Sequence, residues 1–457
     1  MPGLPGSLAA LLSLLAPAFT APSFETFCFL VVGFLARVGE HTVTGMLQAA
    51  RRERVWHHSR AHAFFSRARW SVDELGLLLL DFLVATLVPA GAPLRLAVDD
   101  SLFGRTGRKV YGAHYHYDAT APAGAGRQIG FGNNWVVLAL IVRLPVLERA
   151  IGLPVLFRLW RPAPRVKSRR AGVQTRGRRL DPAFPSKPEL ARQLVDLICA
   201  RYPARALELL GDSAYATGAL AGLPARVTIT ARLKANAALY GLKPPPTGKR
   251  GRPALKGKRL PSLKAIADDP ATSWQQTSVG SGGKTETVCC HSLVCLWYGV
   301  FGQRPVRVVI VRDPKRRDGY DIALVSSDLS ASARELIERY DERWSIEVCF
   351  EDAKQLTGVG QARNRTRTAV ERTVPFGFLC QTLTVAWYAR HGHADHDVRR
   401  RRLAAPWYQQ KRSPSYQDML TSLRRELIIS QYRAVTARAA RPPQISRPAQ
   451  ALKAAAA

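Results

Sequence analysis

Apolar residues recur at helical spacing through the first part of the chain. We expect an apolar helix at 27–38, a short helix at 42–50, a basic helix at 58–70 and a longer apolar helix at 70–88. The unit at 42–70, a short helix, a turn and a basic helix, fits a helix-turn-helix that reads a DNA groove. It fits equally well a helical bundle whose basic face is solvated, so both interpretations stay open.

Strand patterns begin at residue 94. Short apolar runs at 94–98, 135–142, 155–160 and 206–210 predict strands. Residues 186–202 predict a helix with Ser186 as its N-cap and Pro188 in its first turn. Because strands and helices alternate, we expect an α/β fold, in which ligands gather outside the carboxyl ends of the strands.

Residues 226–311 depart from this alternation. Strand-like pieces at 227–233, 285–298 and 306–311 surround a loop at 244–259 that is rich in Pro, Gly and Lys, and we interpret the region up to about 305 as a β-rich insertion. A long helix is expected at 333–356 and an apolar helix at 374–388. A basic tail follows from residue 399 and ends in low-complexity alanine.

The charge balance indicates a polyanionic partner. The chain of 457 residues has 67 Lys and Arg against 34 Asp and Glu, a net charge of +33, and 47% of its residues are hydrophobic. This hydrophobic fraction excludes a wholly disordered basic chain. A folded chain with so large a positive charge repels itself until phosphates neutralise it, and nucleic acid is therefore the expected partner.

Cysteine and targeting patterns indicate a reducing compartment. The seven cysteines are scattered without a C-x-x-C pair, so we expect free thiols and neither a disulfide framework nor a structural zinc site. The apolar opening at 8–19 follows no Lys or Arg and is interrupted by Pro17, which disfavours a signal peptide. No other apolar run is long enough for a membrane span. We expect a cytoplasmic protein without a membrane partner.

The helix expected at 333–356 carries the most informative polar residues. At about 100° per residue, five of them fall within roughly 80° of one another on one face. These are Tyr340, Arg343, Glu347, Glu351 and Lys354. A solvated face with ordinary ion pairs would explain this stripe. Apolar residues that interleave with it predict instead a segment buried on several sides, where a charge must be paired or functional. They are Trp344, Ile346, Val348 and Phe350.

Two further acids, Asp99 and Asp212, stand where predicted strands end. From that position a carboxylate points into the cleft outside the sheet. Together with Glu347 they would supply three carboxylates from three elements, about the minimum for holding two Mg²⁺ ions. Two metals about 3.5 to 4 Å apart can activate an attacking water or 3′-hydroxyl and stabilise the leaving oxygen.

These residues carry a family resemblance. Residues 340–354 read YDERWSIEVCFEDAK, which resembles the Y-x-x-R-W-x-I-E-x-x-F-x-x-x-K signature of the DDE transposases of bacterial insertion sequences. The run DDS at 99–101 resembles the first acid motif of that family, and GDSAY at 211–215 resembles the second. Within the family the chain looks most similar to the seven-oh-one branch of the insertion-sequence-four superfamily.

The resemblance implies an RNase H-like catalytic domain that is interrupted by the β-rich insertion. The implied parts are a helical N-terminal DNA-binding domain at 1–90, the catalytic domain at 91–216 and 306–395, the insertion at 217–305, and a basic, helical C-terminal region at 396–457. The separations of 113 residues from Asp99 to Asp212 and of 135 residues from Asp212 to Glu347 resemble those of members with such an insertion.

The resemblance also implies residue roles. Asp99, Asp212 and Glu347 would be the catalytic metal ligands for two Mg²⁺ ions, for which Mn²⁺ can substitute, with Asp100 as the alternative to Asp99. From the signature, Tyr340, Arg343 and Lys354 would contact DNA. Apart from the resemblance, the positive charge of the turn beside the first acid and of the basic helix predicts further DNA contacts by Arg105, Arg108, Lys109, Arg60, Arg67 and Arg69.

The predicted function is that of a transposase. It would bind the terminal inverted repeats of an insertion sequence as a homodimer on double-stranded DNA, cleave the strands and transfer them to target DNA, and it would be associated with the nucleoid. The alternatives are a catalytically decayed DNA-binding protein, acting as a repressor or architectural factor, and a two-metal nuclease without strand transfer. All three acids are present, which favours the transposase.

Overall fold

A mixed sheet of ten strands organises the computed structural model, which describes residues 4–117, 128–163, 183–245 and 253–439. The strands lie in the order β2-β3-β1-β5-β6-β10-β9-β8-β7, and β4 pairs with β3 outside this path. Their bounds are β1 Leu94–Gly104, β2 His114–Tyr117, β3 Ile129–Val142, β4 Ile151–Trp160, β5 Leu207–Gly211, β6 Val227–Arg232, β7 Gln275–Ser281, β8 Lys284–Cys295, β9 Val306–Arg312 and β10 Ile322–Ser326. The middle of the loop expected at 244–259 and the alanine-rich end of the tail lie outside the described residues.

The central five strands have the arrangement of an RNase H-like domain. β4 and β1 each pair antiparallel with β3, and β5 and β6 follow β1 in parallel. All five residues of β5 are buried, and β3 is buried from Gly132 to its end, as expected of strands that are covered on both faces. The predicted α/β fold is confirmed.

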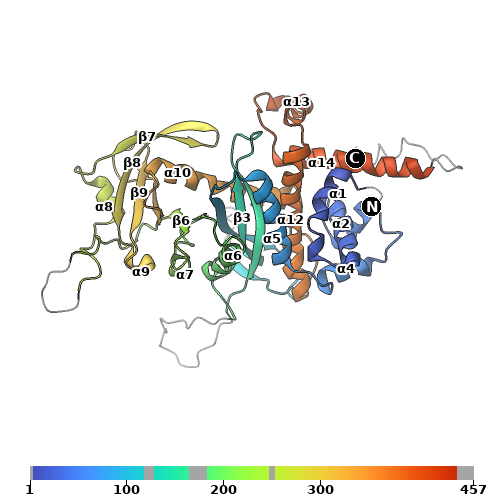
Figure 1. The fold of residues 1–457 in the computed structure, drawn as a ribbon, viewed down its shortest axis with the longest axis horizontal. Coiled ribbons are helices and arrows are strands. Elements are labelled where there is room, and N and C mark those ends of the chain that lie inside the picture. Colours follow the sequence, from blue (N-terminus) through green and yellow to red (C-terminus); the bar gives the residue numbers. More distant parts are fainter. Residues whose placement is uncertain (1–3, 118–127, 164–182, 246–252, 440–457) are drawn as a thin grey trace.

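The region expected to be an insertion continues the same sheet. β6 pairs in parallel with β5 and antiparallel with β10, and β9, β8 and β7 extend the sheet by antiparallel pairing. Figure 1 shows β7, β8 and β9 at the end of the molecule farthest from α12 (Arg367–His391). The region is rich in strands as expected, but the proposed boundaries at 216/217 and 305/306 fall between paired strands and stay predictions.

Helices pack against this sheet and against one another. Besides α12, they are α1 Gly6–Ser13, α2 Ala21–Ala36, α3 Val43–Ala49, α4 His58–Ser66, α5 Val72–Leu87, α6 Lys187–Arg201, α7 Gly218–Ala221, α8 Leu263–Asp268, α9 Tyr298–Phe301, α10 Ala333–Glu342, α11 Trp344–Gln355, α13 Ala394–Ala404 and α14 Tyr416–Ala439, with 3-10 turns at Ala16–Ala18 and Pro406–Tyr408. The α5, α6, α11 and α12 helices contact β4. The α6 helix begins with the expected cap, because Ser186 and Glu189 form a reciprocal capping box.

The N-terminal helices pack against α12 through aromatic side chains. The rings of Phe27, Phe64 and Phe65 each meet Phe376 of α12 with centroids 5.2 to 6.3 Å apart. Figure 1 shows α1, α2 and α4 beside α12 and α14. Residues 42–70 are thus part of a packed helical bundle, and their reading of a DNA groove stays a prediction.

Three expected elements differ from the structure. The strand expected at 94–98 continues to Gly104, because β3 pairs with it along the whole of that length. The basic helix expected at 58–70 ends at Ser66, where the chain turns so that buried Trp70 can donate a hydrogen bond to the carbonyl of Phe64 at 2.8 Å. The single helix expected at 333–356 is interrupted at Arg343, which separates α10 from α11.

The expectation of free thiols is confirmed, because all seven cysteines are buried and form no disulfide. In the described ranges no helix combines the length and the apolar character that crossing a membrane would need.

Candidate active site

The pairing of β1 with β5 brings Asp99 and Asp212 to the same edge of the parallel strands. Val98 is paired with Gly211, so the next residue of each chain segment is an acid. Asp212 follows the last residue of β5, whereas Asp99 lies inside β1 because that strand continues along β3. Burial is the main cause of the raised pKa of Asp99, and the nearby negative charge of Asp212 adds to it.

Arg343 links the first acid to the helical acid. Its Nη1 donates to Asp99 Oδ2 at 3.0 Å, and its Nη2 donates to Glu347 Oε1 at 2.5 Å. The residue is only 9% exposed, its guanidinium carbon lies 5.4 Å from the centre of the Tyr340 ring, and its buried Nε has no hydrogen-bond partner in the described structure. The polar stripe is therefore not a solvated face at this point.

Burial sets the protonation of Asp99. Desolvation raises the pKa of its carboxyl to about 7, although the Arg343 guanidinium and the amide of Asp100 lower it. A buried carboxylate of this kind gains from a nearby cation, whether an arginine or a metal ion. The site therefore favours positive charge beside Asp99.

Asp100 points to the opposite face of β1. Its carboxylate accepts hydrogen bonds from Lys187 Nζ of α6 at 2.5 Å and from the Tyr215 hydroxyl at 3.1 Å. Neighbouring residues of a strand point to opposite faces, so Asp99 shares a face with α11 and Asp100 shares one with α6. The geometry thus favours Asp99 as the acid that belongs with Glu347.

The break between α10 and α11 is held by Glu342, a residue that the sequence did not single out. Its carboxylate accepts from Arg143 Nε at 2.6 Å and from Arg95 Nη1, and its side chain is 5% exposed. Arg95 also donates to Glu208 of β5 at 2.8 Å. Arg95 lies four residues before Asp99 on β1, so both side chains point to the same face of the sheet. This even spacing was the signal in the sequence that could have placed Arg95 near the candidate site.

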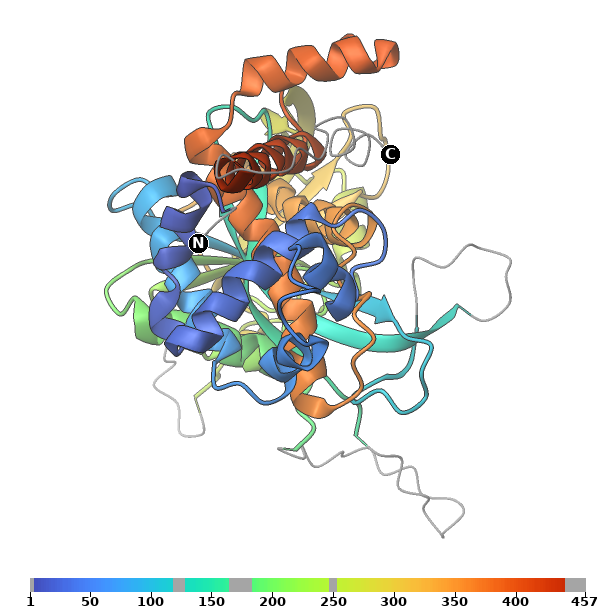
Figure 2. The same cartoon turned by 90° about the vertical axis from the view of Figure 1, so that its right-hand side faces the viewer.

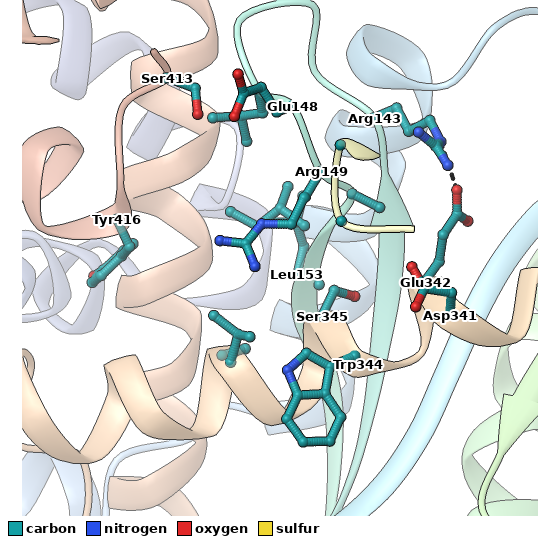
Figure 3. A pocket seen from close by; sticks show the side chains of 18 of the residues that line it. Arg143, Glu148, Arg149, Leu153, Asp341, Glu342, Trp344, Ser345, Ser413 and Tyr416 are labelled. Carbon is teal, nitrogen blue, oxygen red and sulfur yellow. Dashed lines mark hydrogen bonds and ion pairs between the residues drawn. The ribbon is translucent and has the colours of Figure 1, made fainter. Parts of the chain in front are cut away.

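The expected burial of α11 on several sides is only half correct. Ile346 and Phe350 are buried, but Trp344 is 57% exposed and Val348 is 36% exposed. Both line a cavity of about 1020 Å³ between the helix pair, the β3–β4 connection and residues 413–419. Figure 3 shows Trp344 and Ser345 at this cavity, with Arg149, Glu148 and Tyr416 around it. One side of α11 therefore faces the candidate catalytic acids, and another side faces this cavity.

Among Lys354 and the residues of the basic turn, some side chains are exposed and one is held inside the structure by hydrogen bonds. Lys354 is exposed, and its Nζ lies 5.3 Å from the centre of the Phe103 ring. Arg108 and Lys109 are exposed. Arg105 instead donates to Asn133 Oδ1 at 2.8 Å and to two backbone carbonyls at 2.7 Å, so its guanidinium holds the loop at 360–362 and is not available to DNA.

The basic helix divides in the same way. Arg60 donates to Glu25 at 2.6 Å and lies over the Trp56 ring, so its guanidinium is engaged within the helical bundle, and its contact with DNA stays a prediction. Arg67 and Arg69 are exposed, but they follow the end of α4 and do not lie on it. A DNA contact by these two would come from a turn.

The site fits a divalent metal by its donor chemistry. Asp99, Asp212 and Glu347 offer carboxylate oxygens, the ligands that Mg²⁺ prefers, and burial leaves Asp99 in need of a cation. Within the described residues, no three acidic, histidine or cysteine side chains form a ready cluster that could hold a metal ion. Two of these three carboxylates are bound to the Arg343 guanidinium.

The mixed sheet of RNase H-like order, with two acids at the carboxyl end of its parallel strands, defines the class of the protein as an α/β fold with an acidic site. The family model described as DDE superfamily endonuclease matches residues 14–291, more than half of the chain. The chain belongs to this family, which acts on DNA and generally uses divalent metals. The match includes Asp99 and Asp212 and ends before Glu347. No curated protein matches the chain.

Proposed function

We propose that this endonuclease is a transposase that cleaves DNA at the terminal inverted repeats of an insertion sequence and joins the strands to target DNA. The observation that carries the proposal is the convergence of Asp99, Arg343 and Glu347 beside the strand end at which Asp212 follows β5. Family membership supplies the DNA substrate. The signature at 340–354 supports transposition over simple hydrolysis. We also propose that the protein belongs to the seven-oh-one branch of the insertion-sequence-four superfamily.

The proposed metal ligands are Asp99, Asp212 and Glu347. Two Mg²⁺ ions, or Mn²⁺ in their place, would polarise the scissile phosphate and activate the attacking hydroxyl when bound. The chain's own part would be to hold Asp99 next to Asp212 through the pairing of β1 with β5, and next to Glu347 through Arg343.

Arg343, Tyr340 and Lys354 are the proposed phosphate contacts. Arg343 is already buried between two acids, and a guanidinium in a water-poor site stabilises phosphate charge more strongly than one in solvent. Tyr340 lies against it, and Lys354 presents an exposed ammonium about three helical turns beyond on the same side of the chain. These residues would orient the scissile strand.

Recognition of the element ends is assigned to the N-terminal helices, and the active assembly is a homodimer on double-stranded DNA. The support for recognition is the exposed basic character of Arg67, Arg69 and the neighbouring turns, since phosphates are bound by surface cations. Acting on DNA, the protein would work in the cytoplasm at the nucleoid.

The test is cleavage of labelled duplex DNA that carries the inverted repeats flanking the coding region, in Mg²⁺. The parent chain should cut at the repeat ends and join the 3′ ends to a second DNA. Binding without any cleavage in Mg²⁺ or Mn²⁺ would favour the decayed DNA-binding protein, and cleavage without joining would favour a nuclease.

A further inference from the structure

An aromatic surface lies on the ribbon formed by β2 and the start of β3. Tyr115 and Tyr117 are each 74% exposed, and Ile129 is 49% exposed. The register pairs Tyr115 with Phe131 and Tyr117 with Ile129. Figure 2 shows the start of β3 reaching out from the helices toward the right of the view. We call these four residues the ribbon surface.

The ribbon surface shares a face of the sheet with the proposed catalytic acids. Residues that are directly opposite in an antiparallel pair point to the same face, and every second residue of a strand does too. Asp99 is opposite Val137, and Phe131 lies six residues before Val137 on β3, so Phe131 and its partner Tyr115 point to the Asp99 side.

The other face of the ribbon confirms this orientation. His116, the residue between the two tyrosines, is buried and lies 5.5 Å from the Trp160 ring, centroid to centroid. Lys187, the partner of Asp100, lies over the same Trp160 ring at 5.2 Å. His116 therefore belongs to the Asp100 face, and Tyr115 and Tyr117 belong to the Asp99 face.

Exposed basic residues lie in and next to the connection between β1 and β2, and we call them the basic rim. Arg108 and Lys109 follow β1 beside the ribbon, and Arg365 joins them because its carbonyl accepts a hydrogen bond from the amide of Tyr111 at 3.0 Å. All three basic residues are exposed. At about 3.3 Å per residue, the step of six residues from Phe131 to Val137 separates the ribbon surface from the acids by roughly 20 Å. At the rise of about 3.4 Å per nucleotide in duplex DNA this is about six nucleotides, so a tail of six nucleotides is long enough to reach it.

We propose that the ribbon surface binds unpaired bases of the DNA strand that runs from the cleavage site, a role that rests on the proposed action at DNA ends. Exposed tyrosines next to cations match a single strand, whose bases stack on aromatic rings while its phosphates meet the basic rim. The Cα atoms of Tyr115 and Tyr117 are about 6.7 Å apart by strand geometry. This is twice the spacing of about 3.4 Å between successive nucleotides of a strand, which leaves room for one base between the rings.

The test compares the full-length protein with a Tyr115→Ala/Tyr117→Ala variant in EDTA, where cleavage does not interfere. The probes are a blunt duplex and the same duplex with a six-nucleotide single-stranded tail that contains 2-aminopurine. The parent should prefer the tailed DNA and quench the 2-aminopurine fluorescence. The variant should lose about tenfold or more in affinity for the tailed DNA, because stacking on aromatic rings contributes strongly to each bound base. Its affinity for the blunt duplex should change by less than about twofold.

Two control variants complete the experiment. Tyr115→Phe/Tyr117→Phe keeps the rings and should keep the preference for the tail, and Trp407→Ala removes another ring that is 77% exposed and should bind both probes as the parent does. Unchanged affinity and quenching in the double alanine variant would overturn the proposal. So would an equal loss on both probes, an equal loss in Trp407→Ala, or a loss of self-association with unchanged DNA binding, which would make the ribbon surface a contact to a second copy.

A Glu347→Gln variant separates this inference from the proposed function. It should keep the preference for the tail while losing cleavage in Mg²⁺. If Glu347→Gln still cleaves, the assigned catalytic residues are wrong while the ribbon surface is unaffected. If the preference for the tail is missing in the parent protein and cleavage is present, the ribbon inference alone fails.

Discussion

Arg343 holds Asp99 and Glu347 together, with one guanidinium nitrogen 3.0 Å from the Asp99 carboxylate and the other 2.5 Å from Glu347. The contact joins β1 to α11 across 244 residues of sequence. A single cation thus fixes the relative position of two of the three acids that we assign to catalysis. It also leaves Nε buried and without a hydrogen-bond partner among the described residues.

The first prediction concerns the fork of Arg343. Arg343→Lys keeps the positive charge but replaces the planar guanidinium by a single ammonium group. An ammonium cannot bind two carboxylates and a phosphate in the same geometry. Single-turnover cleavage should fall by about ten- to a thousandfold, comparable with the loss of one positioned transition-state donor. The control is Arg334→Lys, because Arg334 is exposed and pairs with Glu338 one turn away. A cleavage rate for Arg343→Lys within about twofold of the parent would contradict the phosphate contact.

The second prediction concerns stability at the helix break. Glu342→Gln leaves Arg95 and Arg143 without the buried charge that they share, so the free energy of unfolding should fall by about 1–3 kcal/mol. Urea unfolding measures this change. In the control, Glu371→Gln removes a solvent-exposed ion pair with Arg367 and should cost less than about 1 kcal/mol. Equal effects of the two changes would show that Glu342 does not anchor the break.

Much of the fold follows from local patterns. The apolar strands 135–142 and 206–210 and the Ser186 cap are visible because their signals lie within a few residues. The extension of β1 through Asp99-Asp100-Ser101 is not visible in the sequence, because the segment is polar and becomes a strand only by pairing with β3. The break at Arg343 was missed for a similar reason, since the buried ion pairs of Glu342 come from distant strands and leave no helix-stop signal.

The sequence selected the candidate site residues but could not give their contacts. Spacing and signature selected Asp99, Asp212, Glu347 and Arg343, yet strand parity alone could not say which of Asp99 and Asp100 faces α11. The hydrogen bonds of Arg105 to the loop at 360–362 were not predictable, because a basic residue beside an acid can equally contact DNA or anchor a loop. The residues that such a side chain contacts in the fold are distant in the sequence, so a local sequence pattern does not reveal them.

A third prediction uses the raised pKa of Asp352, which burial places at about 7. In the unfolded chain this carboxyl has a pKa near 3.9. Between about pH 4 and about pH 7 the folded protein keeps a proton that the unfolded chain has released, so stability falls as pH rises. The parent should therefore lose a few degrees more of melting temperature over this range than Asp352→Asn. Asp99 has a raised pKa in both proteins, so their difference isolates Asp352. Parallel pH profiles would contradict the buried protonated state.

A fourth prediction addresses the excess of positive charge. If the +33 chain meets on the order of six to ten phosphates, its affinity for DNA should fall by about 10³- to 10⁵-fold between 50 and 200 mM salt. Replacing exposed Arg108 and Lys109 with Ala should reduce the slope of log affinity against log salt by about one for each residue that contacts a phosphate. Arg60→Ala should leave the slope unchanged, because Arg60 is paired with Glu25. A flat salt titration of the parent would show that the basic residues do not form a phosphate-binding surface.

The most direct measurement is metal-dependent cleavage by two variants that differ by one position. Asp99→Asn removes the acid on the α11 face, and Asp100→Asn removes the acid that pairs with Lys187 and Tyr215 on the opposite face. The substrate is labelled duplex DNA that carries the inverted repeats, in Mg²⁺. The cleavage rate of Asp99→Asn should fall by at least about a thousandfold, because the carboxylate binds the metal. Its DNA affinity in Ca²⁺ should stay within about threefold of the parent, because the carboxylate does not bind the DNA. Asp100→Asn should cleave within about tenfold of the parent. Normal cleavage by Asp99→Asn together with its loss in Asp100→Asn would contradict the assignment of the catalytic face.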